Sequence, residues 1–205
     1  MEYEPTAGLR PPGMKHSIYG ALVVPRPIGW ITTMSTEGVV NLAPYSFFNA
    51  VSADPMCVMY CANGSHVEGG GKDSLENVRE TGEFVTNLVT ADLAKPMNDS
   101  SISAPRSVDE MALVGLDPQP SLKVKPPRVG AAPIHLECEL DRIVELPSSD
   151  TTLNRMVIGR VVQVHISDEV IVDGMVDWGR LRPLARLGYL DYAEISEPFS
   201  LDRPD

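Results

Sequence analysis

The sequence predicts a mainly β protein, a closed antiparallel β-barrel that carries a few short helices. Short runs of β-type residues follow one another at close spacing, and each run ends at a turn that contains proline or glycine. Strands and helices do not alternate regularly along the chain, which argues against a doubly wound parallel sheet. The content of 43% hydrophobic and 22% charged residues is typical of a globular protein that buries a core.

Residues 1–16 are interrupted by prolines and are expected to form a loosely attached lead-in. The remainder shows no internal repeat and no low-complexity linker. A chain of 205 residues has the length of one ordinary domain. We therefore expect a single domain over residues 1–205.

Strands are expected where an apolar or β-branched run is bounded by turn residues. In the N-terminal half these runs are 21–24, 28–34, 39–43, 56–62 and 83–89. Ser35-Thr-Glu-Gly38 forms a favourable hairpin turn between the second and the third run. Pro44 cannot donate to a sheet ladder, so it is expected to break its strand and leave backbone amides for a ligand.

Residues 134–140 alternate between apolar and polar side chains. One face would carry Ile134, Leu136, Cys138 and Leu140, and the other His135, Glu137, Glu139 and Asp141. This pattern predicts a strand with one face in the core and one face in water. A long strand over residues 156–166 is expected to pair with it.

Three short helices are expected. Residues 74–80 begin with Ser74 as a capping side chain and stop at Gly82, the residue type favoured just past a helix end. Ser107-Val-Asp-Glu110 has the spacing of a capping box and predicts a helix over 108–114. A third short helix over 91–98 is limited by its proline.

The formal net charge is −11, which disfavours nucleic acid and anionic lipid as partners. No stretch approaches the ~20 apolar residues of a membrane helix, and the N-terminus lacks the apolar run of a signal peptide. Three cysteines do not make the even-numbered disulfide framework of a small secreted protein. We expect a cytoplasmic protein with reduced thiols and no membrane or nucleic-acid partner.

Hydroxyl, amide and aromatic side chains are dense over residues 25–55. Thr32 and Thr33 end one expected strand, and Ser46 and Asn49 lie further along this segment. A flat, amphipathic heterocycle would take hydrogen bonds from such groups along its edge and rest its face on apolar atoms. The alternative is a polar turn that packs on core phenylalanines.

Gly69-Gly-Gly-Lys72-Asp-Ser74 leads into the first expected helix. Free amides at a helix start, an ammonium group and a hydroxyl make an anion site that suits a phosphate monoester. The alternative is an ordinary capped helix with a solvated lysine. Asp73 breaks the P-loop pattern, and no G-x-G-x-x-G motif occurs. The histidines and cysteines show no metal-ligand spacing, so no metal site is expected.

Several segments resemble the flavin reductase-like, FMN-binding split-barrel family, and the resemblance covers residues 17–204. These segments are RPIGWITT, NLAPYSFFNAVSADP, GKDSLENVRETGEFVTNLV, GRVVQVHISDEVI and PLARLGYLDYAEISEPFSLDRP. The resemblance implies a Greek-key split barrel that forms a homodimer and binds one FMN in each crevice near the subunit interface.

The resemblance also implies which side chains bind the cofactor. By position these are Thr32 and Thr33 beside the flavin, Ser46, Phe48, Asn49 and Ala50 along its ring, and Lys72 and Ser74 at the phosphate. Ser74 stands where the family's Lys-Asp-Thr/Ser motif more often has threonine, and it keeps the hydroxyl. Trp30 would border the flavin or fill the barrel. Arg26 is a weaker phosphate candidate than Lys72.

The implied activity is an NAD(P)H-dependent flavin reductase that moves hydride from NADH or NADPH to the flavin. The cofactor supplies the electron sink, so no catalytic side chain is named. A monooxygenase or another redox partner would receive the electrons. The alternative is a flavoredoxin-like electron carrier that a protein partner reduces and that has no nicotinamide site. A split barrel with a non-redox ligand or partner is the third hypothesis.

Overall fold

A computed structural model describes residues 2–5, 10–148, 152–195 and 197–204. Its body is a seven-stranded antiparallel sheet with the strand order β3-β2-β6-β9-β10-β5-β4. The bounds are β2 (Gly29–Met34), β3 (Val40–Tyr45), β4 (Phe48–Ala53), β5 (Met56–Asn63), β6 (Glu83–Leu88), β9 (Ile134–Glu145) and β10 (Asn154–Ile166). The predicted mainly β, antiparallel class is confirmed.

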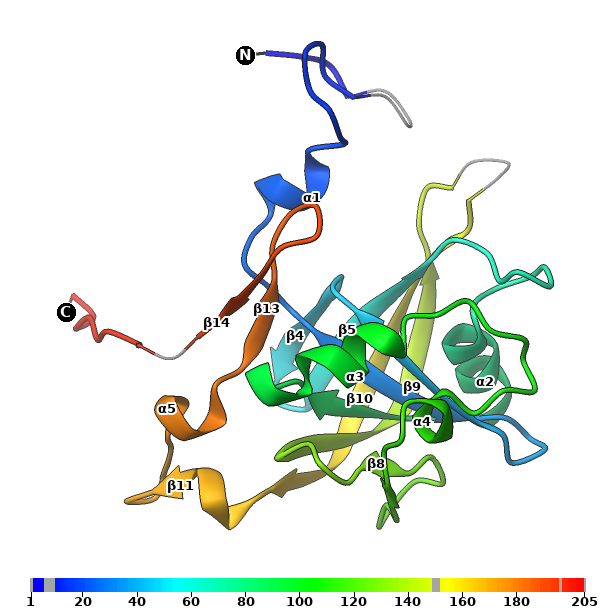
Figure 1. The fold of residues 1–205 in the computed structure, drawn as a ribbon. Coiled ribbons are helices and arrows are strands. Elements are labelled where there is room, and N and C mark those ends of the chain that lie inside the picture. Colours follow the sequence, from blue (N-terminus) through cyan, green and yellow to red (C-terminus); the bar gives the residue numbers. More distant parts are fainter. Residues whose placement is uncertain (1, 6–9, 149–151, 196, 205) are drawn as a thin grey trace.

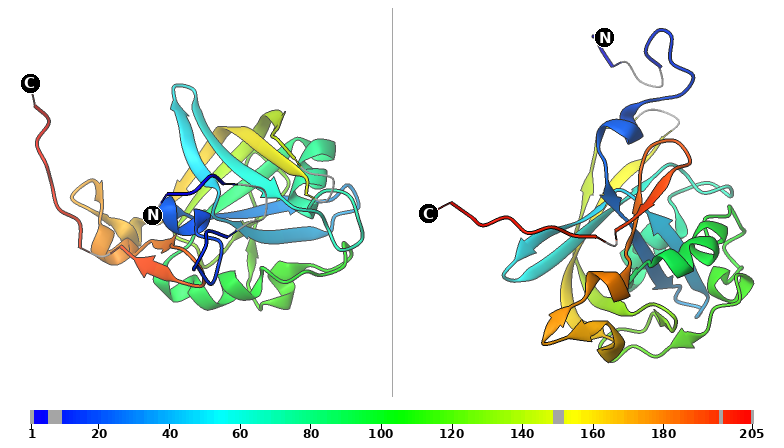
Figure 2. Two further views of the ribbon diagram at one scale, coloured as in Figure 1. Left: turned by 90° about the horizontal axis from the view of Figure 1, so that it is seen from above. Right: turned by 60° about the vertical axis from the view of Figure 1, so that its left-hand side comes forward.

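The sheet is rolled so that its two edges meet (Figure 2). Strands β3 and β4 form opposite edges of the sheet, yet only Ser46 and Phe47 separate them in the chain. Three consecutive Cα steps span at most roughly 11 Å, which brings the end of β3 to the start of β4. The Phe47 carbonyl also accepts a hydrogen bond from the Cys61 amide of β5 at 2.8 Å. We call residues 45–48 the seam of the barrel.

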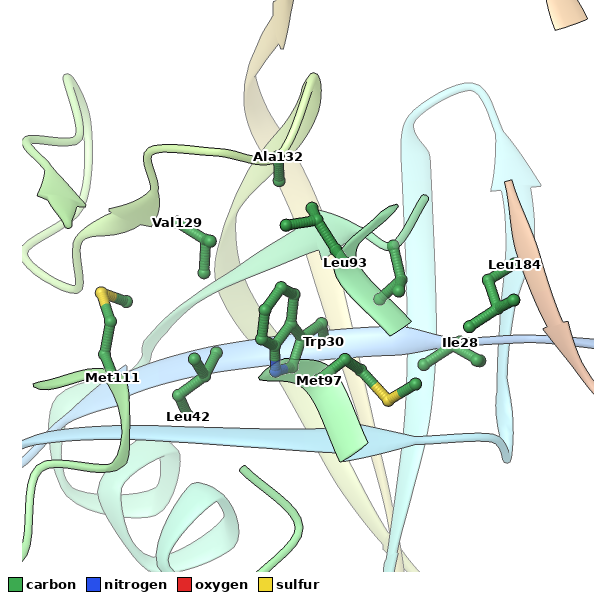
Figure 3. Close-up of a cluster of buried hydrophobic side chains, with 10 residues drawn as sticks. Ile28, Trp30, Leu42, Leu93, Met97, Met111, Val129, Ala132 and Leu184 are labelled. Carbon is green, nitrogen blue, oxygen red and sulfur yellow. The ribbon is translucent and has the colours of Figure 1, made fainter. Parts of the chain in front are cut away.

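Two clusters of buried side chains pack on opposite faces of the sheet, because the consecutive β2 residues Trp30 and Ile31 belong to different clusters. The first surrounds Trp30 and includes Ile28, Leu42, Met97 and Leu184 (Figure 3). The Trp30 indole donates a hydrogen bond to Ser100 Oγ at 2.9 Å, so this side chain is fully buried between β2 and the segment of Met97 and Ser100 that covers the sheet. The second cluster surrounds Tyr60 and Phe84. At position 159 of β10 any Cβ would collide with the Phe84 ring, which explains a glycine in mid-strand.

The strand expected over residues 21–24 is wrong. This segment contributes to α1 (Tyr19–Leu22) and lies outside the sheet (Figure 1). The Arg26 guanidinium donates hydrogen bonds to the carbonyls of Gly20 and Val23, the latter at 2.7 Å. A side chain thus satisfies the carbonyls that a neighbouring strand would have taken.

The break expected at Pro44 is also wrong. Strand β3 continues through Pro44 to Tyr45, and Pro44 pairs with Trp30 of β2. An edge strand bonds to a neighbour on one side alone, and this position tolerates a residue that lacks an N–H.

The water-exposed face expected for 134–140 is buried at its start. His135 and Glu137 are 3% and 0% exposed. The loop before β9 covers them, because the Glu137 carboxylate accepts hydrogen bonds from the amides of Leu122 and Lys123 at 2.8 and 2.6 Å. The expected pairing of this strand with β10 is confirmed.

The expected helices are present with different starts. Helix α2 (Asp73–Thr81) begins after Lys72 without a side-chain cap, and it ends at Gly82, whose φ is 73°. The 91–98 segment divides into η1 (Ala91–Leu93) and α3 (Ala94–Asp99).

The predicted capping box at residues 107–110 does not form. Helix α4 (Glu110–Leu113) is one turn long and is capped by Asp109, whose carboxylate accepts from the Ala112 amide at 2.9 Å. The Glu110 side chain leaves its own helix and accepts from the Leu42 amide of β3 at 3.2 Å.

A C-terminal arm, residues 184–194, lies beside the barrel (Figure 1). Strands β13 (Leu184–Arg186) and β14 (Tyr192–Glu194) join β1 (Arg26–Pro27) in a three-stranded sheet. The smaller elements are β7 (Pro118–Gln119), β8 (Arg128–Val129), η2 (Asp168–Val170), β11 (Ile171–Val172), β12 (Met175–Val176) and α5 (Trp178–Leu181). Within the described ranges, no helix has the length and apolar character needed to cross a membrane.

The lead-in expected over 1–16 extends away from the barrel in its described part (Figure 1). Residues 1 and 6–9 of this segment lie outside the described residues. The single-domain organisation stays a prediction.

Candidate functional site

A pocket of about 300 Å³ opens at the seam of the barrel, at the lower end of the volume range of roughly 300–1,000 Å³ for small-molecule sites. We call it the seam pocket. Its lining combines β3, the seam residues Ser46 and Phe47, the end of β5, two loops and the first residues of α2 and α4: Asn41, Ala43, Pro44, Tyr45, Ser46, Phe47, Cys61, Asn63, His66, Val67, Lys72, Asp73, Ser100, Ser101, Ile102, Ser103, Ala104 and Glu110. The chain folds this way because β3 and β4 are joined by two residues alone.

One wall of the seam pocket is rich in hydroxyl groups, and hydrogen bonds to neighbouring residues hold it in position. Ser100 Oγ accepts from the Trp30 indole and donates to the Met97 carbonyl at 2.8 Å. Ser101 Oγ donates to the Asn98 carbonyl at 2.6 Å. These bonds fix the turn after α3, so that the following residues face the pocket. The opposite wall, formed by Ala43, Pro44 and Phe47, is mostly apolar.

An unpartnered acceptor lies in the same pocket. Asn63 Oδ1 is buried and has no hydrogen-bond partner within the described part of the chain. A buried acceptor that is left unpaired costs roughly 1–3 kcal/mol. A ligand that carries an N–H or O–H donor would remove this cost.

Lys72 is a positively charged residue of the pocket that no carboxylate among the described residues neutralises. Among the described residues, no acidic oxygen lies within ion-pair distance of its ammonium group. Asp73 is neutralised by Arg106, which bonds to it directly, and its other oxygen lies 3.2 Å from His66 Nε2. The pocket therefore offers a positive charge to an anionic ligand.

Glu110 lies deep in the pocket wall and is 4% exposed. Burial raises the pKa of its carboxyl group to about 7, and the nearby charges of Asp73 and Asp109 act in the same direction. The hydrogen bond from the Leu42 amide opposes this shift. This carboxyl group therefore keeps its proton to a higher pH than an ordinary glutamate does.

A buried hydroxyl network lies behind the pocket. The Tyr45 and Ser74 hydroxyl groups bond to each other, and the Tyr60 hydroxyl donates to the Ser74 carbonyl at 2.9 Å. Burial raises the pKa of Tyr45 to about 12, so the phenol stays neutral. The network ties the end of β3 to the first turn of α2.

Ser46 and Lys72 are the predicted site residues that the structure brings together in the seam pocket. Ser74 lies just behind the wall, fully buried, with its hydroxyl directed to Tyr45. The first turn of α2 also carries Asp73 and Glu76, so the chain's own carboxylates occupy part of the anion site expected there.

Thr32 and Thr33 are fully buried on opposite faces of β2 and do not line the pocket. Thr32 Oγ1 accepts from Asn87 Nδ2 at 2.8 Å. Thr33 Oγ1 accepts from the side-chain amides of Asn41 and Asn77 at 3.1 and 3.0 Å. Asn41 lines the pocket, so the connection of Thr33 to the site runs through that side chain.

Three predicted residues lie on the edge strand β4, outside the pocket. The Phe48 ring packs over Gly29 of β2, where the absence of a Cβ makes room for it. Asn49 and Ala50 are exposed, and Asn49 Oδ1 accepts from the Ala50 amide at 2.9 Å. Their contact with a flavin stays a prediction.

Arg26 is held by the polypeptide backbone. Its guanidinium donates to three carbonyls, including that of Leu187 at 2.9 Å, and its Nε lies 3.4 Å from Ser46 Oγ. The residue joins α1, the seam and the C-terminal arm. Its position supports Ser46, and the phosphate role of Lys72 stays a prediction.

Sequence reasoning missed Asn63, Glu110 and the serines of the 100–103 turn. The serine-rich composition of this turn was a visible signal, but nothing in the sequence placed it beside β3. Glu110 was assigned to its own helix cap, because local spacing cannot show a bond to a strand 68 residues away. Within the described residues, no group of three or more His, Cys, Asp and Glu side chains is arranged to hold a metal ion.

Comparisons with known proteins agree with this arrangement. The family model described as "flavin reductase like domain" matches residues 21–184. A curated relative from Halalkalibacterium halodurans, the protein BH2278, is 37% identical over 188 residues, which cover 89% of this chain and 87% of the relative.

Solved structures show the same similarity. Nitrilotriacetate monooxygenase component B from Bacillus cereus is 29% identical, with a TM-score of 0.82 over 97% of this chain and 100% of that chain. The 2-nitrobenzoate 2-nitroreductase NbaA from Pseudomonas fluorescens is 30% identical, with a TM-score of 0.82 over 99% of this chain and 96% of that chain.

A more distant structure bears on the fold alone. A protein from Shewanella frigidimarina with a split barrel domain superposes with a TM-score of 0.77 at 21% identity, over 90% of this chain and 89% of that chain. The split barrel predicted from the sequence is confirmed. Because the family model spans most of its length, the chain belongs to the flavin reductase-like family.

Proposed function

We propose that this protein binds FMN in the seam pocket and is an NAD(P)H-dependent flavin reductase. The observation that carries the proposal is one pocket with an unpaired cation at Lys72, an orphaned acceptor at Asn63 and an apolar wall. FMN presents the complementary groups, namely a phosphate, hydrogen-bond donors and a planar ring. Two neighbours that are 29% and 30% identical have names that describe redox enzymes or their components.

The residues of the pocket would divide the binding between them. Lys72 would hold the phosphate, while the hydroxyl groups of Ser101 and Ser103 would meet the polar chain of the cofactor. Asn63 would accept a hydrogen bond from the cofactor, and Ala43, Pro44 and Phe47 would exclude water from one side. Thr32, Thr33 and Ser74 would act from behind the wall, and Phe48, Asn49 and Ala50 would approach from β4. FMN supplies the electron sink when it is bound, taking hydride from a dihydronicotinamide.

The assembly is part of the proposal. We expect a homodimer, which would place a second chain against the open side of the seam, and a monooxygenase or another redox protein as the electron acceptor. The neighbour from Bacillus cereus is named as the component of a monooxygenase, which supports this kind of partner. The expected compartment is the cytoplasm.

Steady-state oxidation of NADH and of NADPH in the presence of FMN tests the activity. We expect oxidation well above the spontaneous rate with at least one nucleotide. Rates equal to the protein-free control with both nucleotides would contradict the reductase function. The net charge of −11 favours the electron-carrier alternative, because an acidic surface suits docking to a basic redox protein. Tight FMN binding without nucleotide oxidation would support that alternative.

A further inference from the structure

A second cavity opens beside the seam pocket, and we call it the side chamber. Its volume is about 540 Å³, and it shares Pro44, Ser46 and Ser101 with the seam pocket. The two cavities are therefore adjacent, with these three residues in the lining of both. Ile28 and Met97 of the Trp30 cluster lie side by side and contribute apolar surface to the chamber (Figure 3).

The C-terminal arm supplies Arg186 and Tyr192 to the chamber. The Arg186 guanidinium lies 4.4 Å from the centre of the Tyr192 ring, and it donates a hydrogen bond to the Tyr189 carbonyl. The Tyr192 hydroxyl reaches Asn98 Oδ1 of α3 at 3.4 Å, which connects the arm to the other side of the chamber. These contacts hold the stacked Arg186 guanidinium in place, and its remaining N–H groups are available to bind a ligand.

Arg186 is also opposed by a like charge. In the antiparallel pairing of β1 with β13, Arg186 lies directly opposite Arg26, an arrangement that destabilises a sheet. Burial lowers the pKa of Arg26, and the charge of Arg186 adds to this effect. Among the described residues, neither arginine has a carboxylate partner, although the chain has 28 acidic and 17 basic residues.

Glu194 of the arm and Asp92 of η1 are already paired with another arginine. Glu194 and Asp92 both pair with Arg182, at 2.7 and 3.2 Å. The Arg186 guanidinium, which has no carboxylate partner among the described residues and lies next to an aromatic ring and apolar side chains, forms a complement to a planar anion.

We propose that the side chamber binds the anionic, ring-bearing molecule that exchanges electrons with the flavin, and that Arg186 recognises its anionic group. This inference rests on the proposed function, because it places the co-substrate beside the cofactor pocket. The shared chemistry is an aromatic ring with a carboxylate or a phosphate. A nucleotide phosphate and a free aromatic carboxylate are its two sources.

The test uses FMN-loaded wild-type protein and the variant Arg186→Gln. Benzoate is titrated against the flavin absorbance, with the neutral benzamide as a matched probe. We expect benzoate to bind at least tenfold more tightly than benzamide, and Arg186→Gln to weaken benzoate about tenfold or more, because a charge-assisted bidentate contact is lost. The dissociation constant of FMN should change less than twofold. Arg186→Lys should restore part of the benzoate affinity, and Arg180→Ala, which changes an exposed arginine of α5, should leave both constants unchanged.

A parallel titration with NADH and NADPH separates the two sources. A selective loss of NADPH affinity in Arg186→Gln would identify a nucleotide phosphate as the anion, and a loss for benzoate alone would identify an aromatic carboxylate. Unchanged affinities for every anion would overturn the inference while FMN binding stands. An equal loss of FMN affinity would also overturn it, because Arg186 would then belong to the cofactor site. Failure of the wild type to bind FMN would overturn the proposed function itself.

Discussion

No carboxylate among the described residues neutralises the ammonium group of Lys72, although acidic residues outnumber basic residues in this protein. Lys72→Ala should weaken FMN by about 1–3 kcal/mol, because a charge-assisted contact to the phosphate is lost. A fluorescence titration of FMN measures this change. Lys95→Ala is the matched control, since Lys95 is exposed and pairs with Asp99 on α3. Equal affinities of FMN for wild type and Lys72→Ala would place the phosphate elsewhere.

Glu110 makes the free energy of unfolding depend on pH. Its pKa is about 7 in the folded protein, against 4.5 for an ordinary glutamate, so the folded state binds more protons between these values. The free energy of unfolding should therefore fall as pH rises from about 4.5 to about 7, by at most about 3 kcal/mol from this group. In Glu110→Gln this contribution should disappear. Urea unfolding of both proteins between pH 5 and 8 measures it, and identical pH slopes would refute the assignment.

At the scale of elements, the loop before β9 is held by one buried carboxylate. Burial acts to raise the pKa of Glu137, but hydrogen bonds from Leu122, His165 and Lys123 together lower it below its ordinary value. Such a group stabilises the fold above the ordinary glutamate pKa, and this stability is lost as pH falls through the lowered folded pKa.

Glu137→Gln should destabilise the protein by about 1–3 kcal/mol at pH 7, because one acceptor oxygen and its charge are lost. Chemical denaturation measures the difference, which should shrink in acid as the wild-type carboxylate becomes protonated. Glu139→Gln, two residues along β9, removes an exposed ion pair with Arg160 and should cost no more than about 1 kcal/mol. Equal losses in the two variants would show that the loop does not depend on Glu137.

The elements that the sequence predicts well are those whose partners are local. The Ser35–Gly38 turn closes the β2–β3 hairpin as expected, and Gly82 ends α2, because each depends on a few consecutive residues. A strand is expected over residues 21–24 from their apolar composition, which does not show that the Arg26 guanidinium bonds the Val23 carbonyl and that α1 takes up part of the segment. The alternating pattern predicts that His135 and Glu137 face water. It cannot show that a loop covers this face of the strand.

The candidate site could also be predicted only in part, because sequence motifs reveal some of its residues and tertiary contacts bring in the others. Motif resemblance found Ser46 and Lys72, which line the seam pocket. Asn63 and the 100–103 turn belong to it through tertiary contacts alone. Sequence spacing could not show that β3 and β4 are opposite edges of one rolled sheet, and this closure creates the pocket.

At the scale of the whole molecule, apolar side chains of the N-terminal segment are open to solvent. Tyr19, Leu22, Val23 and Val24 are 44–63% exposed. Exposed apolar side chains close together in the chain are typical of an interaction site, and they are consistent with the proposed homodimer. Light scattering should give twice the chain mass of 22.3 kDa.

The same measurement on variants tests which surface forms the dimer. Leu22→Asp should shift the mass to that of a single chain, because a buried charge opposes association. Leu113→Asp, which changes an exposed leucine of α4, should remain dimeric. Dimers of both variants would exclude the N-terminal segment as the interface, and a monomeric wild type would refute the homodimer.

The central claim is that the seam pocket holds a flavin which a nicotinamide nucleotide reduces. An anaerobic absorbance spectrum of the protein with FMN, recorded before and after addition of NADH and then NADPH, tests it most directly. We expect a perturbed flavin spectrum on binding and bleaching of the bound flavin by one of the two nucleotides. A bound flavin that stays oxidised with both would contradict the reductase function and favour the electron carrier, and an unperturbed FMN spectrum would contradict the cofactor site itself.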